Sequence, residues 1–139
     1  MLKELIEAGY GEAEDYNCAE KIINGANVAY DLQLDKQATK LFAGFGGGMA
    51  VGDTCGTVTA AIGVLSGIFI EERAHESKEF KLICQDFMHR FGQQMSSNNC
   101  TELRRLYRDP QSKCLRVLSA AAGILDEMLL ERDMLPLNK

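Results

Sequence analysis

The chain has 139 residues, of which 46% are hydrophobic and 25% charged, proportions typical of a soluble globular protein with a single domain over residues 1–139. A formal net charge of −5 provides no basic surface of the kind that binds nucleic acid. The longest uncharged run, residues 54–70, is at the short end of the membrane-spanning range and contains glycine, threonine and serine. It therefore predicts a buried central helix and no membrane span.

The spacing of apolar residues predicts an all-α bundle of six or seven helices. The first helix covers residues 2–8, and the N-terminal residues around it lack the apolar segment of a secretory signal, so the protein is expected in the cytoplasm. The second covers residues 17–31. The third lies within residues 34–45, begins at the capping residue Asp35 and ends at a run of glycines.

The later helices follow the glycine run. The uncharged helix begins at Asp53 or Thr54 and reaches residue 70, and Ser77 caps the next one. A short helix covers residues 98–107. Asp109 and the proline after it begin the last helix, because Asp caps helices and Pro is tolerated at the first helical position. The core stripe of this last helix consists of Leu115, Leu118, Ala122, Leu125 and Leu129.

Five cysteines occur, and none of them forms a C-x-x-C pair. An odd count without a signal peptide argues against an extracellular disulfide framework. The two histidines are not at zinc-ligand spacing from any cysteine, so a zinc ribbon or finger has no support. The cysteines are therefore thiols, metal ligands or members of a reversible disulfide: Cys18, Cys55, Cys84, Cys100 and Cys114.

The segment "GFGGGMAVGDTCGT", residues 44–57, resembles a phosphate-binding loop only in its glycine content. No Lys-Ser or Lys-Thr follows the glycines, and no credible strand precedes them, so neither a P-loop nor a dinucleotide fingerprint is present. The run predicts a flexible turn that leaves room to approach Cys55. The candidate cofactor-binding positions are Gly46, Gly47, Gly48, Gly52 and Gly56.

Four of the cysteines are expected in the first turns of helices. The pattern Asn-Cys-x-Glu at residues 17–20 and 99–102 resembles a capping box and places Cys18 and Cys100 at the first helical position. Cys55 is expected one or two residues inside its helix, and Cys114 near the start of the last one. Free N–H groups and the positive end of the helix dipole lower the pKa of a thiol in such a position.

Basic residues close in sequence to Cys100 and Cys114 are expected to lower their pKa further, although a solvated helix face explains the same run. They are Arg104, Arg105, Arg108, Lys113 and Arg116. Cys84 differs from the other cysteines, because it lies in mid-helix on the stripe of Phe80, Phe87 and Phe91 and is expected to fill the core.

The ordered signature "NCAE", "GFGGGM", "TCG", "NCTEL" and a lone downstream cysteine resembles the C_GCxxG_C_C family over about residues 15–130. The family tends to have Ala and then Gly after its second cysteine, where this chain has Thr57 and Ala60. The resemblance implies an α-helical bacterial or archaeal redox-active protein and excludes Cys84 from the site. The four family cysteines correspond to Cys18, Cys55, Cys100 and Cys114.

The expected function is redox activity or electron transfer at these four cysteines. They either ligate an iron–sulfur cluster or zinc, or form a reversible disulfide site in which Cys55 is the attacking thiol and Cys100 and Cys114 are partners. The alternative is a helical interaction or scaffold protein with structural cysteines. A redox partner protein is expected, and apolar surface on residues 54–70 and 129–139 is suited to a homodimer.

Overall fold

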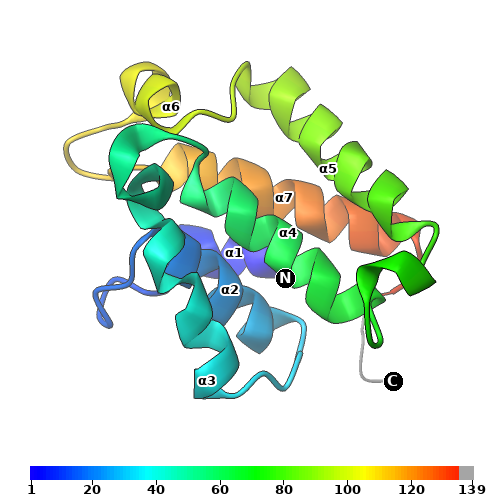
Figure 1. The fold of residues 1–139 in the computed structure, drawn as a ribbon. Helices are drawn as coiled ribbons and strands as arrows, with labels where there is room; N and C mark the ends of the chain where they lie inside the picture. The colour runs from blue at the N-terminus through cyan, green and yellow to red at the C-terminus, as the bar shows by residue number, and fades with distance from the viewer. Residues whose placement is uncertain (135–139) are drawn as a thin grey trace.

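The computed structural model describes residues 1–134, in which seven α-helices form one bundle without β-strands (Figure 1). The predicted all-α architecture is confirmed. The helices are α1 Leu2–Glu7, α2 Cys18–Ala29, α3 Lys36–Thr39, α4 Gly56–Phe69, α5 Phe80–Met95, α6 Cys100–Tyr107 and α7 Leu115–Glu131. Three short turns connect them: η1 Lys40–Phe45, η2 Gly48–Gly52 and η3 Ala74–Glu76.

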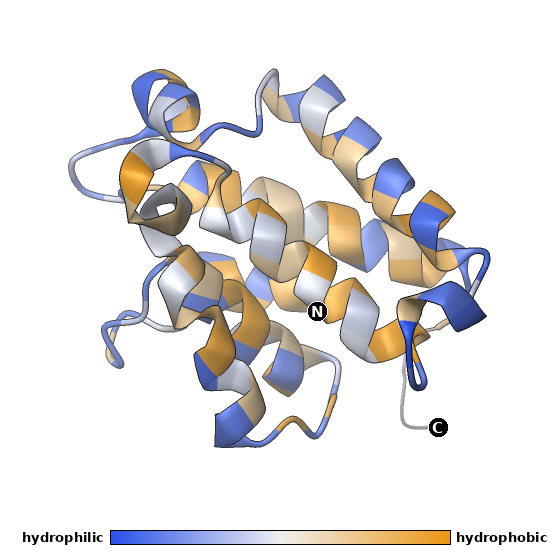
Figure 2. Cartoon of the chain, in the orientation of Figure 1, coloured by the Kyte–Doolittle hydropathy of each residue, from blue (hydrophilic) through white to orange (hydrophobic). Residues whose placement is uncertain are grey.

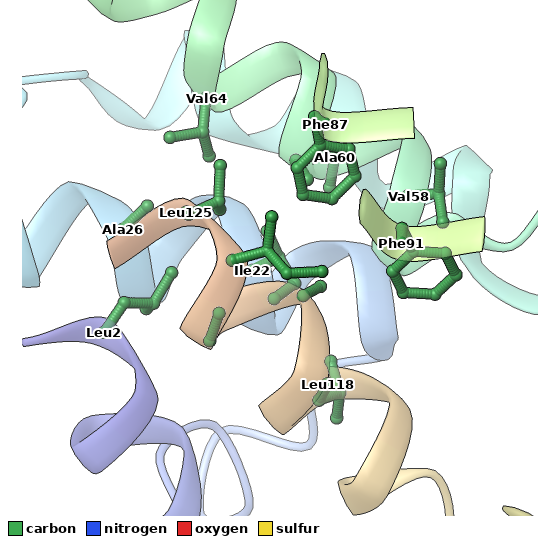
Figure 3. Packing of buried hydrophobic residues seen from close by; sticks show 14 of the residues in the cluster. Leu2, Ile22, Ala26, Val58, Ala60, Val64, Phe87, Phe91, Leu118 and Leu125 are labelled. Carbon is green, nitrogen blue, oxygen red and sulfur yellow. The ribbon is translucent and has the colours of Figure 1, made fainter. Parts of the chain in front are cut away.

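The uncharged helix α4 lies at the centre and packs against α2, α5 and α7, while α1 packs against α7. Apolar positions face inward and charged positions cover the outer helix faces (Figure 2). Ile22 from α2, Val64 from α4 and Leu125 from α7 meet in the core (Figure 3). The predicted stripe on α7 is confirmed, with Leu115 partly buried and its other four members buried.

A buried carboxylate ties the N-terminus of the chain to this core. Asp126 on α7 accepts hydrogen bonds from the backbone N–H groups of Leu2 and Lys3, both at 3.0 Å, and from the Tyr30 hydroxyl at 2.6 Å. It therefore supplies the cap that α1 lacks within its own segment.

Three predicted helix starts are wrong. The helix expected from Asp53 or Thr54 begins at Gly56, because the backbone at these earlier residues pairs with residues 98–100 instead. Ser77 makes no side-chain capping bond, and α5 begins at Phe80. Asp109 accepts from the N–H groups of residues 111 and 112 and closes a turn, which delays α7 to Leu115.

None of the described helices combines the length and apolarity that a membrane span requires. Some apolar side chains are exposed, including Leu130 near the end of α7 with 52% of its surface accessible. Residues 135–139, part of the segment expected to favour a homodimer, lie outside the described residues. The homodimer stays a prediction.

Candidate functional site

The first residues of α4 and α6 are joined by backbone hydrogen bonds. The N–H of Cys55 donates to the carbonyl of Asn98 at 2.8 Å, and the N–H of Cys100 donates to the carbonyl of Asp53 at 2.6 Å. An isolated antiparallel bridge between Thr54 and Asn99 completes this link. Two cysteines that are far apart in the sequence thus begin neighbouring helices at the end of the bundle beside α6 (Figure 1).

The start of α2 reaches the same place through contacts that require glycine. A Cβ on Gly56 would lie 2.5 Å from the Phe45 carbonyl oxygen and 2.9 Å from the Cys18 sulfur. Asn17 donates from its amide to the Ala43 carbonyl at 2.9 Å, which attaches η1 to the start of α2. Gly56 therefore permits the close approach of the helices that carry Cys18 and Cys55.

Three other glycines of the run, Gly46, Gly48 and Gly52, also permit close contacts with neighbouring segments. Gly48, at φ +63°, has no room for a Cβ, which would lie 2.7 Å from the Cys100 Cβ. A Cβ on Gly46 would overlap the Asn17 side chain, and one on Gly52 would overlap the Thr101 hydroxyl. Gly47 lines an open cavity, and contact between the five glycines and a cofactor stays a prediction.

The predicted asparagine caps are confirmed. The Asn17 side chain accepts from the N–H of Glu20 in a complete capping box, and the Asn99 side chain accepts from the N–H of Glu102. Cys18 and Cys100 consequently occupy the first helical position, as predicted. Cys55 and Cys114 are themselves the N-cap residues of α4 and α7, whereas they were expected inside the first turns of these helices.

The four cysteines divide into an inner and an outer pair. The inner pair, Cys55 and Cys100, is buried, with 5% and 6% of its surface exposed. The outer pair, Cys18 and Cys114, is half-buried and lines one cavity of about 230 Å³. The expectation that the glycine turn leaves Cys55 accessible is therefore wrong, because this thiol is buried where Gly48 and Gly56 pack closely against Cys100 and Phe45.

Burial also reverses the expected thiol acidity. Desolvation raises the pKa of Cys55, and nearby Cys18 adds to the increase, while Thr57 and the N–H group of Val58 oppose it. The pKa of Cys114 is raised by desolvation first and by Cys18 and Cys100, although Arg108 and Arg104 partly offset this. For these two thiols, removal from water outweighs the interactions that lower the pKa.

A polar atom beside the inner pair lacks a partner. The Thr57 hydroxyl is fully buried and makes no hydrogen bond of normal geometry to any described residue. It still lies close enough to the Cys55 thiol to lower its pKa. The sequence indicated only that Thr57 departs from the family pattern, and its burial depends on the packing of α4.

The basic residues divide between different surfaces. Arg104, Arg108 and Lys113 line the cavity of the outer pair. Arg105 instead pairs with Glu102, and Arg116 lies over the Tyr107 ring at 5.0 Å from its centroid. Lys21, which the sequence reasoning missed, joins the cavity because it follows Cys18 by three residues and shares its helix face.

In the part of the chain that the structure describes, no group of three or more His, Cys, Asp or Glu side chains is positioned to hold a metal ion. All five cysteines are free thiols. In this arrangement the four sulfurs do not form a ready ligand set for zinc or for an iron–sulfur cluster.

Cys84 lies apart from the other cysteines, as expected, but it does not fill the core. It is half-buried and lines a surface groove together with His75, Phe80 and Lys81. Phe87 and Phe91 do occupy the core. Desolvation raises the pKa of the Cys84 thiol.

Comparison with protein families gives one match, over residues 16–128, to the family described as "Putative redox-active protein (C_GCAxxG_C_C)". All four cysteines of the inner and outer pairs lie within the matched residues, so the family resemblance noted in the sequence is confirmed. No curated protein and no solved structure matches the chain.

Proposed function

Because the chain belongs to the C_GCAxxG_C_C family of putative redox-active proteins, we propose that it performs reversible thiol–disulfide exchange through Cys18 and Cys114. The observation that carries this proposal is their shared position: both thiols are half-buried and line the same cavity. A substrate disulfide that enters the cavity meets two thiols, whereas Cys55 and Cys100 are covered.

The exchange is balanced by its disulfide substrate. One thiolate of the outer pair attacks a sulfur of the substrate, forming a mixed disulfide and releasing one substrate thiolate. The second thiol, after losing its proton, attacks the protein sulfur of that mixed disulfide and releases the other half of the substrate. The outer pair thereby loses two electrons and two protons and gains one S–S bond, and the substrate becomes two thiols.

The test is to map the bridge. Fully reduced protein is incubated with 2-hydroxyethyl disulfide, quenched in acid, alkylated and analysed by peptide mass spectrometry. A Cys18–Cys114 bridge is expected, and Cys18→Ser and Cys114→Ser should each abolish it. Cys84→Ser is the matched control and should leave the bridge intact. A bridge that forms between other cysteines in preference, or no bridge at all, would contradict the proposal.

An iron–sulfur or zinc centre is a competing use of the same four thiols. Its support is that the starts of α4 and α6 are joined by backbone hydrogen bonds, the Cys18 sulfur lies close to Gly56, and Cys18 and Cys114 line one cavity. The sulfurs would have to move closer, since the described residues contain no group able to hold a metal. Anaerobic purification and reconstitution with iron and sulfide, or with zinc, distinguishes it: a bound metal that protects all four cysteines from alkylation favours the metal centre.

The scaffold alternative uses no cysteine chemistry. Replacement of all four cysteines by serine would then leave partner binding intact. A redox protein should instead lose its exchange activity in this variant while far-ultraviolet circular dichroism still reports a helical fold.

A further inference from the structure

The cavity of the outer pair carries an excess of positive charge. Its lining includes four cationic side chains, Lys21, Arg104, Arg108 and Lys113, and two acidic ones, Glu12 and Asp15. The protein as a whole has a net charge of −5. A cationic cavity on an acidic protein is a local feature that overall charge does not account for.

The acidic side chains do not neutralise the arginines. Glu12 forms an ion pair with Lys21, with 2.5 Å between its Oε1 and the Lys21 Nζ, and the field of Lys113 also lowers the pKa of Glu12. Among residues 1–134, neither Arg104 nor Arg108 forms an ion pair. Two guanidinium groups therefore remain able to bind an anion, and each offers N–H donors in the planar arrangement that matches a carboxylate.

The arginines line the same cavity as the outer pair of thiols. Arg108 and Arg104 also act electrostatically on the Cys114 thiol, where they partly offset the increase in pKa that burial causes. Gly47, at φ +67°, forms the facing wall, where an added Cβ would lie 3.6 Å from Arg104 Nη2. The cavity of about 230 Å³ is of a size that suits a small molecule.

We propose that this cavity binds small disulfides that carry a carboxylate, with Arg104 and Arg108 holding the carboxylate so that the S–S bond faces Cys114. The proposal rests on the exchange function above and adds the substrate class and the order of attack. Cys114 attacks first and forms the mixed disulfide, releasing one half of the substrate as a thiolate. Cys18 then attacks the Cys114 sulfur, which releases the second half and closes the protein disulfide.

Three small disulfides of different charge test the substrate class. Reduced protein is reacted with dithiodiglycolate, which is anionic, with 2-hydroxyethyl disulfide, which is neutral, and with cystamine, which is cationic. Rates of modification are followed by quenching and mass spectrometry at low and high salt. The ratio of the anionic to the neutral rate should be about tenfold higher for the protein than for a free small thiol. High salt should reduce this difference.

Arg104→Gln and Arg108→Gln should each remove most of the preference for the anionic probe. Because loss of a nearby cation also changes the reactivity of the thiol, the readout is the ratio of anionic to neutral rates within each variant. Arg105→Gln is the matched control, since it removes the same charge from the same helix at a residue that pairs with Glu102 and does not line the cavity. Its ratio should stay at the wild-type value.

Each outcome distinguishes the two proposals. The anion site is overturned, while exchange itself stands, if all three probes react at equal rates after correction by the rates of a free small thiol. It is also overturned if Arg105→Gln lowers the ratio of anionic to neutral rates as much as Arg104→Gln does. If no probe yields a Cys18–Cys114 bridge, the exchange function fails as well. In Cys18→Ser, the anionic probe should be trapped on Cys114, and trapping on another cysteine would overturn the order of attack.

Discussion

Cys18 and Cys114 of the outer pair and Cys55 and Cys100 of the inner pair occupy nearly the same local position, at the first residue or the N-cap of a helix. Their surroundings differ. The outer pair lines a cationic cavity, whereas the inner pair is buried where the backbone at the starts of α4 and α6 is hydrogen-bonded. A helix start is therefore not enough to make a thiol reactive, because access and desolvation are set by what packs over it.

Gly56 lies where the start of α4 approaches Cys18, and a substitution at this residue should have the largest effect on stability. Gly56→Ala should lower the free energy of unfolding by about 2–3 kcal/mol, because the added methyl group meets the Phe45 carbonyl and the Cys18 sulfur. Chemical denaturation measures the change. Gly67→Ala in the same helix meets nothing within 4 Å and should stabilise the protein by up to about 1 kcal/mol. Equal effects of the two substitutions would contradict the close approach seen at Gly56.

Thiol accessibility should separate the pairs next. With a limiting amount of iodoacetamide, the native protein should be alkylated at Cys18 and Cys114 about tenfold or more faster than at Cys55 and Cys100, because the inner pair must wait for local opening. Peptide mass spectrometry at timed intervals gives the four rates. Denaturant should make them nearly equal. Labelling of Cys55 as fast as Cys114 in native conditions would remove the distinction between the pairs.

Alkaline pH should reveal the burial of Cys55 through its effect on stability. Because the pKa of Cys55 is raised in the folded state, the unfolded chain loses this proton first as pH increases. Stability should be retained below the ordinary thiol pKa of about 8.5 and decline above it, with this thiol contributing at most about 1.4 kcal/mol per pH unit. Denaturation curves between pH 7.5 and about 9.5 should show a shallower decline for Cys55→Ala. An unchanged slope would contradict the raised pKa.

Several features of the site were predictable from local sequence. Asn17 and Asn99 cap their helices through a bond to an N–H three residues later, so the signal and the contact lie within one turn. Asp35 caps α3 for the same reason. The uncharged segment that became α4 was predicted to be central and buried, because an uncharged helix has no face suited to solvent.

Other features depend on partners distant in sequence. The early start expected for α4 fails because the Asp53 carbonyl accepts from Cys100, which is far along the chain. The late start of the last helix has a local cause instead, because Asp109 pairs with Lys113, which has a positive φ of 56°, and forms a turn there. The glycine run resembled an exposed loop, and only the positions of Phe45, Cys18 and Cys100 reveal that it allows close packing.

The sequence by itself determined the all-α fold, the family and the four cysteines at helix starts, since helix periodicity, caps and motif order are all properties of neighbouring residues. The tertiary structure decided which thiols meet the solvent and which basic residues face them. That division arises from packing: Cys55 and Cys100 lose their water to the covering chain, while Cys18 and Cys114 keep a cavity beside Arg104 and Arg108.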